Sequence, residues 1–234
     1  MDNRDLLKKY VNTGRVLPYN QYKKIQEMPP ILKSYQRARN IAVQNDSKKL
    51  AIYELPDEAL ATFKDISFKD KDLIEIPTFI YKTKELKFLN LDKNYLSNIP
   101  EILIDHLSNT NILEIAINGN RLTTLPENIG NLKSLRSLQL TGNLLTTLPE
   151  SFGYLEKLRE FYIVFNNLTS LPESIGSLQQ LEYLNLAANN LRTLPESIKY
   201  LQNLENLNLK GNPMDPNYIS KLENEILPNC NINF

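Results

Sequence analysis

The chain has 234 residues, and its 27 Lys+Arg balance its 27 Asp+Glu, so the formal net charge is zero. With 41 % hydrophobic and 23 % charged residues, the composition is that of a globular protein and excludes a disordered polyelectrolyte, and no apolar stretch reaches the roughly 18 residues of a membrane-spanning helix. A single cysteine and a single histidine exclude an intramolecular disulfide and a cysteine-based zinc site, and they argue against histidine-dependent catalysis.

The chain begins with a basic segment. Residues 1–50 contain 11 Lys+Arg against 4 Asp+Glu, and the remaining residues carry the compensating acidic excess. One interpretation of this charge is a solvated helix face, and the other is a surface for an anionic membrane or nucleic acid. We favour the first and expect no nucleic-acid partner. The first residues lack the apolar run of a signal peptide, which predicts a cytoplasmic protein.

Helices are expected in the same segment. The Pro29-Pro30 pair precedes apolar residues at helical spacing, namely Ile31, Leu32, Tyr35, Ala38, Ile41 and Ala42. The run Pro56-Asp57-Glu58 is typical of the start of a second short helix. We therefore predict that residues 1–62 form a basic helical cap or subdomain, and that residues 63–234 form a separate domain.

A 23-residue pattern repeats through this second domain. It is anchored on asparagines at a constant spacing: Asn120, Asn143, Asn166, Asn189 and Asn212. Asn94 belongs to the same series, with three inserted residues between it and Asn120. Apolar residues stand eight, five and three positions before each asparagine and two after it. The resulting template is L-x-x-L-x-L-x-x-N-x-L-x-x-L-P-x-x-I-G-x-L-x-x.

This template resembles the leucine-rich repeat family, in particular its 23-residue class with the Leu-Pro-x-x-Ile-Gly segment, and the chain is similar to bacterial intracellular or effector-type members. The resemblance implies an α/β solenoid, or horseshoe. It would have a concave parallel sheet of about seven strands, and short helices or 3₁₀ turns on the convex side. It also implies a structural ladder inside the coil, formed by Asn94, Asn120, Asn143, Asn166, Asn189 and Asn212.

Elementary physical chemistry agrees with this expectation. The L-x-L stretch alternates with the period of a strand that buries one face. A 23-residue unit is too small to bury its own leucines, so stacked units must share one core. An asparagine amide offers donors and an acceptor that can satisfy the backbone groups of a turn.

The sequence also predicts the structure of the convex turns and of the C-terminal end. Within Leu-Pro-Glu-Ser-Ile-Gly, proline suits the first turn of a short helix. Glycine recurs at one place, as Gly130, Gly153 and Gly176, whereas Lys199 breaks the pattern. We predict a final helix over Asn217–Glu225 and a closing segment over residues 227–234, so that a C-terminal cap occupies about residues 215–234.

Side chains between the core leucines should point to the open face of the sheet. One contiguous apolar group is expected there: Tyr162, Val164 and Phe165, with Tyr183 on the adjacent strand and Leu144 at the border. Phe88 and Tyr95 form a second, smaller anchor, and Arg121 completes the candidate partner-binding residues. An exposed aromatic patch often marks a protein-binding site. The alternative is that Phe165 folds into the core and Val164 is idle surface.

The sequence contains no pattern of a catalytic or cofactor site. Its glycines are not spaced as in nucleotide-binding loops, and no set of metal ligands surrounds His106, which is expected on the surface. We therefore predict no enzyme, no cofactor and no metal, and a scaffold that binds a protein or peptide partner on its concave face. The alternative is a bacterial effector, delivered into host cells without a cleaved signal peptide, that sequesters or recruits a host protein.

Overall fold

The computed structural model describes residues 57–234, so most of the predicted N-terminal cap lies outside the described residues. Its last turn is α4 (Asp57–Ala61), the short helix expected after Pro56. Ala59 and Leu60 of α4 are buried and belong to the same apolar core as the repeats. This turn therefore packs on the array.

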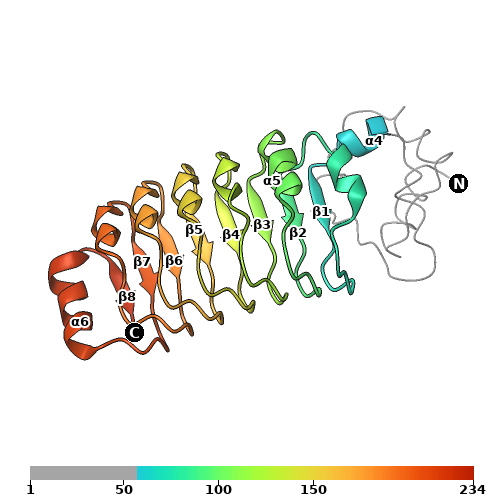
Figure 1. The fold of residues 1–234 in the computed structure, drawn as a ribbon. Coiled ribbons are helices and arrows are strands. Elements are labelled where there is room, and N and C mark those ends of the chain that lie inside the picture. Colours follow the sequence, from blue (N-terminus) through green and yellow to red (C-terminus); the bar gives the residue numbers. More distant parts are fainter. Residues whose placement is uncertain (1–56) are drawn as a thin grey trace, which may run out of the picture.

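Short parallel strands form one open sheet (Figure 1). They are β1 (Asp65–Ser67), β2 (Phe88–Asn90), β3 (Glu114–Ala116), β4 (Ser137–Gln139), β5 (Glu160–Tyr162), β6 (Tyr183–Asn185), β7 (Asn206–Asn208) and β8 (Asn231–Asn233). Their order in the sheet is their order in the chain. The leucine-rich repeat solenoid is thereby confirmed. Within residues 57–234 the sheet has one strand more than the expected seven, because the closing segment pairs with β7 as β8.

The strand register follows the repeat template. Ile115, Leu138, Phe161, Leu184 and Leu207 stand opposite one another in successive strands. All five are buried, so the central residue of each strand faces the core. Because side chains alternate along a strand, the residues on either side face the concave surface.

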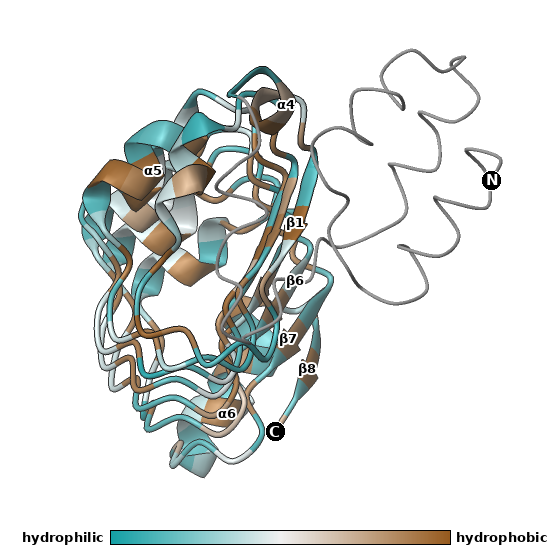
Figure 2. Cartoon of the chain, turned by 90° about the vertical axis from the view of Figure 1, so that its right-hand side faces the viewer, coloured by the Kyte–Doolittle hydropathy of each residue, from teal (hydrophilic) through white to brown (hydrophobic). Residues whose placement is uncertain are grey.

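Short 3₁₀ helices cover the opposite side of the core. They are η2 (Thr78–Lys82), η3 (Ile129–Asn131), η4 (Glu150–Tyr154), η5 (Glu173–Ser177) and η6 (Glu196–Tyr200). In the repeat with three extra residues, an α-helix, α5 (Glu101–Ser108), takes this place. Figure 2 views the array from its end and shows α5 on one side and the strands on the other. The convex side is thus helical, as expected.

The convex turns approach one another closely at the recurring glycines. A Cβ on Gly130, Gly153 or Gly176 would overlap the backbone carbonyl oxygen of the serine in the following turn. Lys199 occupies the same place in the last repeat, where the next element is α6 (Pro216–Lys221) instead of another 3₁₀ helix. Glycine therefore recurs only as far as the close stacking extends.

The C-terminal cap closes the core. The predicted helix over Asn217–Glu225 is formed by α6 and the π-helical turn η7 (Leu222–Ile226). The Asp215 carboxylate caps α6 by accepting a hydrogen bond from the N–H of Asn217 at 2.8 Å. The Tyr218 hydroxyl donates to the carbonyl oxygen of Leu194 at 3.1 Å and ties α6 to the last repeat.

Candidate partner-binding face

The asparagine ladder holds the exits of the strands in place. Asn166 Oδ1 accepts a hydrogen bond from the N–H of Leu145, and Asn166 Nδ2 donates to the carbonyl oxygen of Leu140, both at 3.0 Å. Equivalent pairs of bonds to the preceding repeat are made by Asn94, Asn120, Asn143, Asn189 and Asn212. Breaking the hydrogen bonds of these buried amides would be costly. The backbone that carries the concave side chains is therefore rigid.

The aromatic patch, which we define as Tyr162, Val164, Phe165 and Tyr183, lies on β5, β6 and the exit of β5. The rings of Tyr162 and Tyr183 lie 5.0 Å apart between centroids, with 33° between their planes. Both tyrosines and Val164 are partly exposed. Phe165 is 67 % exposed, so its ring does not fold into the core, and Leu144 in the preceding repeat is 46 % exposed.

Phe165 occupies a left-handed turn, with φ of 52°. The equivalent residues of the other repeats also have positive φ: Asp70, Lys93, Gly119, Gly142, Ala188 and Gly211. This conformation suits glycine and costs about 1 kcal/mol or more for a residue with a Cβ. Neither backbone geometry nor core packing therefore accounts for a large aromatic residue at this place.

The second predicted anchor is divided in the structure. The Arg121 guanidinium lies 4.6 Å from the centroid of the Tyr95 ring, a cation–π arrangement. Tyr95 is 44 % exposed, and Phe88, at the start of β2, is 39 % exposed. No ring, ion or hydrogen-bond contact within residues 57–234 joins Phe88 to this pair. The structure thus brings Tyr95 and Arg121 together and leaves Phe88 apart.

Two carboxylates flank a small residue beside the aromatic patch. Glu114, Ser137 and Glu160 stand side by side at the starts of β3, β4 and β5. Burial, and then the negative charges of Glu160 and Asp65, raise the pKa of Glu114. The Tyr162 hydroxyl donates to Glu160 Oε2 at 3.3 Å. Burial first, and the Glu160 charge next, raise the pKa of Tyr162.

The alternation of side chains along the strands also predicts Glu114 and Glu160 on the concave face, although neither is among the binding residues expected from the sequence. The sequence indicates this pair, because Glu114 and Glu160 stand at the same repeat position with the small Ser137 between them on the intervening strand. A cationic side chain placed over Ser137 would lie between two negative charges.

A second polar ladder runs along the concave face. Asp92 Oδ1 accepts from the N–H of Asn118 at 2.7 Å, and Asn118 Oδ1 accepts from the N–H of Thr141 at 2.8 Å. This ladder ends beside a shallow hollow of about 270 Å³ that is lined by Asn118, Gln139, Thr141 and Tyr162. The hollow therefore joins the polar ladder to the aromatic patch.

The other reactive side chains have structural surroundings. His106, which was expected on the surface, is partly exposed. Its Nε2 lies 3.2 Å from Thr83 Oγ1, and its ring meets the Tyr81 ring edge-on. Burial lowers the pKa of His106. Cys230 is partly buried, and burial raises the pKa of its thiol to about 11, which disfavours the reactive thiolate.

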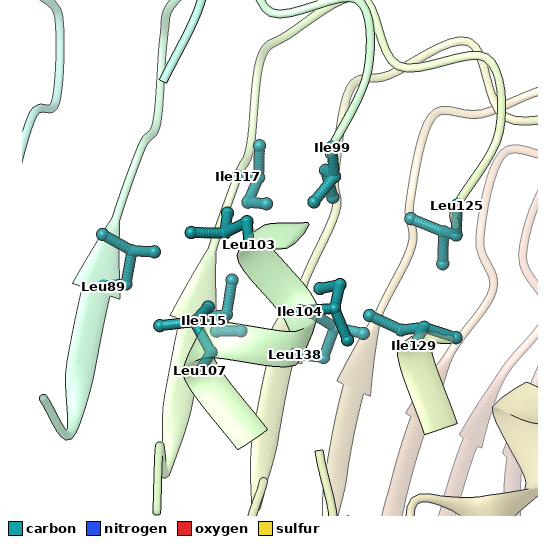
Figure 3. A pocket seen from close by; sticks show the side chains of 10 residues that line it. All are labelled: Leu89, Ile99, Leu103, Ile104, Leu107, Ile115, Ile117, Leu125, Ile129 and Leu138. Atoms are coloured by element: carbon teal, nitrogen blue, oxygen red, sulfur yellow. The ribbon is translucent and has the colours of Figure 1, made fainter. Parts of the chain in front are cut away.

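An apolar gap lies in the core beneath α5 (Figure 3). Leu103, Ile104 and Leu107 of α5 face Ile115 and Leu138 across it, and its volume is about 10 Å³. An aliphatic gap of this size stays dry and has no room for a ligand. No group of three or more His, Cys, Asp or Glu residues within 57–234 is placed to hold a metal ion. In the same residues, no helix has the length and apolar character needed to cross a membrane.

Comparison with known proteins agrees with the repeat. Residues 110–168 and 156–214 each match the family described as Leucine rich repeat. No curated protein matches the chain. Both matched segments fall within the strands and turns described above.

Solved structures share the fold. A leucine-rich repeat protein of Leptospira interrogans is 32 % identical, with a TM-score of 0.61, over 77 % of this chain and 51 % of its own. An internalin of Listeria monocytogenes is 19 % identical, with a TM-score of 0.63, over 76 % of this chain and 49 % of its own, and this likeness shows the fold alone. The chain thus spans about half the length of these two bacterial chains.

A plant structure is also similar. The leucine-rich repeat ectodomain of a membrane receptor kinase from Arabidopsis thaliana, in complex with Casparian strip integrity factor 2, is 28 % identical to this chain. The match covers 68 % of this chain and 20 % of the plant chain, with a TM-score of 0.56. The repeat pattern, the open parallel sheet and these likenesses together identify the chain as a leucine-rich repeat protein, similar to those of bacteria.

Proposed function

We propose that this protein is a non-catalytic scaffold that binds a protein or peptide partner on its concave face, through the aromatic patch. One observation carries the proposal: Phe165 is 67 % exposed beside the stacked Tyr162 and Tyr183 rings. Aromatic side chains of this kind dominate the energetics of protein interfaces. The same positions in neighbouring repeats hold small or polar residues, so the patch is a local feature of the sheet.

The rigidity of the face supports the proposal. The asparagine ladder fixes each strand exit to the preceding repeat, and the Asp92–Asn118–Thr141 ladder fixes the concave backbone next to the patch. A surface that is already ordered loses little conformational entropy on binding. The fold itself is compatible with binding a partner, since the similar plant ectodomain is in complex with Casparian strip integrity factor 2.

A crosslinking capture from the native cell lysate tests this function. The parent is compared with Tyr162→Ala/Phe165→Ala, and with Tyr154→Ala/Tyr200→Ala as the matched control. Tyr154 and Tyr200 lie on the convex turns η4 and η6 and are 61 % and 55 % exposed, so the control removes two exposed aromatic rings from the other side.

We expect the parent and the convex variant to capture the same partner, and the patch variant to lose at least about 30-fold in affinity for it. All three proteins should melt within a few degrees of one another, because the replaced rings are at least partly exposed. A patch variant that binds the captured partner as tightly as the parent does would refute the proposed function.

A further inference from the structure

One backbone donor on the concave face lacks the acceptor that its counterparts have. In each repeat this donor is the N–H two residues beyond the end of the strand. In six repeats it donates to the oxygen of a concave side chain: Lys69 to Ser67, Asp92 to Asn90, Asn118 to Asp92, Thr141 to Asn118, Ala187 to Asn185 and Lys210 to Asn208. These acceptors come either from the same repeat or from the preceding one.

Val164 is the exception. Within residues 57–234 its N–H has no hydrogen-bond acceptor, although Val164 O accepts bonds from Gly142 and Asn166. Two substitutions in the pattern explain this. Tyr162 stands where Asn185 supplies an amide oxygen in the next repeat, and Thr141 stands where Asn118 supplies one in the preceding repeat.

This open donor lies in the middle of the aromatic patch. Val164 is partly exposed, and Thr141 and Tyr162, from which an acceptor would otherwise come, both line the hollow. A donor next to aromatic rings has fewer water molecules to bond. A hydrogen bond to an acceptor from a ligand is therefore stronger there than at an open surface. A backbone carbonyl of another polypeptide is such an acceptor.

The charged residues near the patch favour one sign of charge on a bound segment. Glu114 and Glu160 flank Ser137, and neither carboxylate forms an ion pair among the described residues. Because these two like charges lie on either side of Ser137, a cation placed over Ser137 relieves their repulsion and an anion increases it. An acidic segment is therefore disfavoured at this place.

We propose that the concave face at β4–β6 binds an extended basic segment of a partner protein. A backbone carbonyl of the segment accepts a hydrogen bond from the N–H of Val164, and one of its large apolar side chains packs on Tyr162 and Phe165. A lysine or arginine of the segment lies over Ser137, between Glu114 and Glu160. This inference rests on the proposed function and adds to it the chemistry of the partner.

The spacing of the sheet sets the spacing of the segment. Neighbouring strands lie about 4.8 Å apart, and side chains on one face of an extended chain lie about 6.6 Å apart. Ser137 is on β4, and the patch is on β5 and β6. The basic and apolar residues of the partner therefore lie within about three positions of each other.

Amide hydrogen exchange of the full chain tests the open donor directly. We expect the Val164 amide to exchange at least about tenfold faster than the amides of Thr141 and Ala187, which donate to side chains. Equal protection of the three amides would show that Val164 has an acceptor and would overturn the inference.

A phage-displayed library of random peptides, selected on the full chain, tests the chemistry of the segment. We expect enrichment of peptides in which a lysine or arginine lies within about three positions of a large apolar residue. The best peptide should protect the Val164 amide and should lose about tenfold in affinity for Glu114→Gln/Glu160→Gln, with weaker dependence on salt. An acidic consensus, an absence of enrichment, or an affinity unchanged by this variant would overturn the inference.

A matched pair of variants isolates the backbone bond. Thr141→Asn places an amide oxygen where Asn118 provides one in the preceding repeat, whereas Thr141→Leu adds a side chain of nearly the same shape without an acceptor. We expect Thr141→Asn to slow exchange at Val164 and to weaken peptide binding about 3- to 10-fold more than Thr141→Leu does. Equal affinities of the two variants would contradict the proposed bond.

The two proposals fail in different ways. If Tyr162→Ala/Phe165→Ala still binds the captured partner, the proposed function is wrong. If that variant loses the partner while Thr141→Asn matches Thr141→Leu and Glu114→Gln/Glu160→Gln binds like the parent, the function stands and only the basic extended segment is refuted.

Discussion

The convex and concave sides of this array are built from the same repeats but obey different constraints. On the convex side the turns stack so closely that glycine recurs at Gly130, Gly153 and Gly176, until the stacking ends at Lys199. On the concave side a residue with left-handed backbone recurs in the repeats. Phe165 is this residue in its repeat, whereas the others have glycine, alanine, aspartate or lysine there. The convex side therefore shows what the fold requires, and the concave departures mark positions that the requirements of the fold do not explain.

The largest effect is expected on the convex side, for Gly153→Ala. The added Cβ would overlap the carbonyl oxygen of Ser174, and backbone cannot move aside as a flexible side chain can. We expect a loss of about 3 kcal/mol in the free energy of unfolding, measured with urea. Lys199→Ala, at the same repeat position but without this crowding, should change it by no more than about 0.5 kcal/mol. Similar losses in both variants would show that the close approach of the turns does not explain the need for glycine.

The next effect is expected inside the coil, for Asn166→Ala. This change removes a buried amide that bonds to the backbone of Leu145 and Leu140. We expect the free energy of unfolding to fall by about 1–3 kcal/mol, because the backbone groups are left unsatisfied. The exposed neighbour Asn167 provides the control, since Asn167→Ala removes no such bond. An unchanged melting temperature for Asn166→Ala would refute the structural role of the ladder.

A smaller effect of opposite sign is expected on the concave side, for Phe165→Gly. Glycine relieves the left-handed strain at φ of 52°, and the exposed ring contributes little burial. We expect a gain of about 0.5–1 kcal/mol in the free energy of unfolding. Ala188→Gly, which relieves the same conformation one repeat later, is the reference. Clear destabilisation by Phe165→Gly would mean that the ring supports the fold.

The smallest effect concerns pH, for Glu114→Gln. Burial and the neighbouring carboxylates raise the pKa of Glu114 above its ordinary value of 4.5, so ionisation costs the folded state more than the unfolded state. The stability of the variant relative to the parent should therefore rise as the pH increases through this value, and the two should converge in acid.

Because the Glu114 side chain is exposed, this gain should reach only a few tenths of a kcal/mol at neutral pH. Denaturant titrations at acidic and neutral pH, with the exposed convex-side Glu127→Gln as control, measure it. A gain that is largest in acid would contradict the assigned direction.

The sheet and the core could be predicted from the sequence because both depend on a strict period. Leu138 and Phe161 occupy the same position in successive repeats, and the stacked repeats bury both in one shared core. The eighth strand was missed because the Asn231–Asn233 segment lies outside the repeat template and is ordered by pairing with the free edge of β7. Short helices and 3₁₀ turns were both expected on the convex side, and the sequence did not indicate that α5 would be the α-helical one, because the insertion was identified only by its length.

The candidate site could be predicted only in part. Alternation along the strands placed Tyr162 and Phe165 on the concave side. The open N–H of Val164 could not be predicted, because it depends on whether an oxygen from either of two other side chains reaches it in space. The same limit applies to the contacts of His106, which packs against Thr83 and Tyr81 of another repeat.

The most direct single test is to measure, for Phe165→Gly, the unfolding midpoint and the affinity for the captured partner side by side. We predict a midpoint at or above that of the parent and an affinity at least about tenfold lower. A lower midpoint, or an affinity equal to that of the parent, would contradict the view that this ring serves a partner and not the fold.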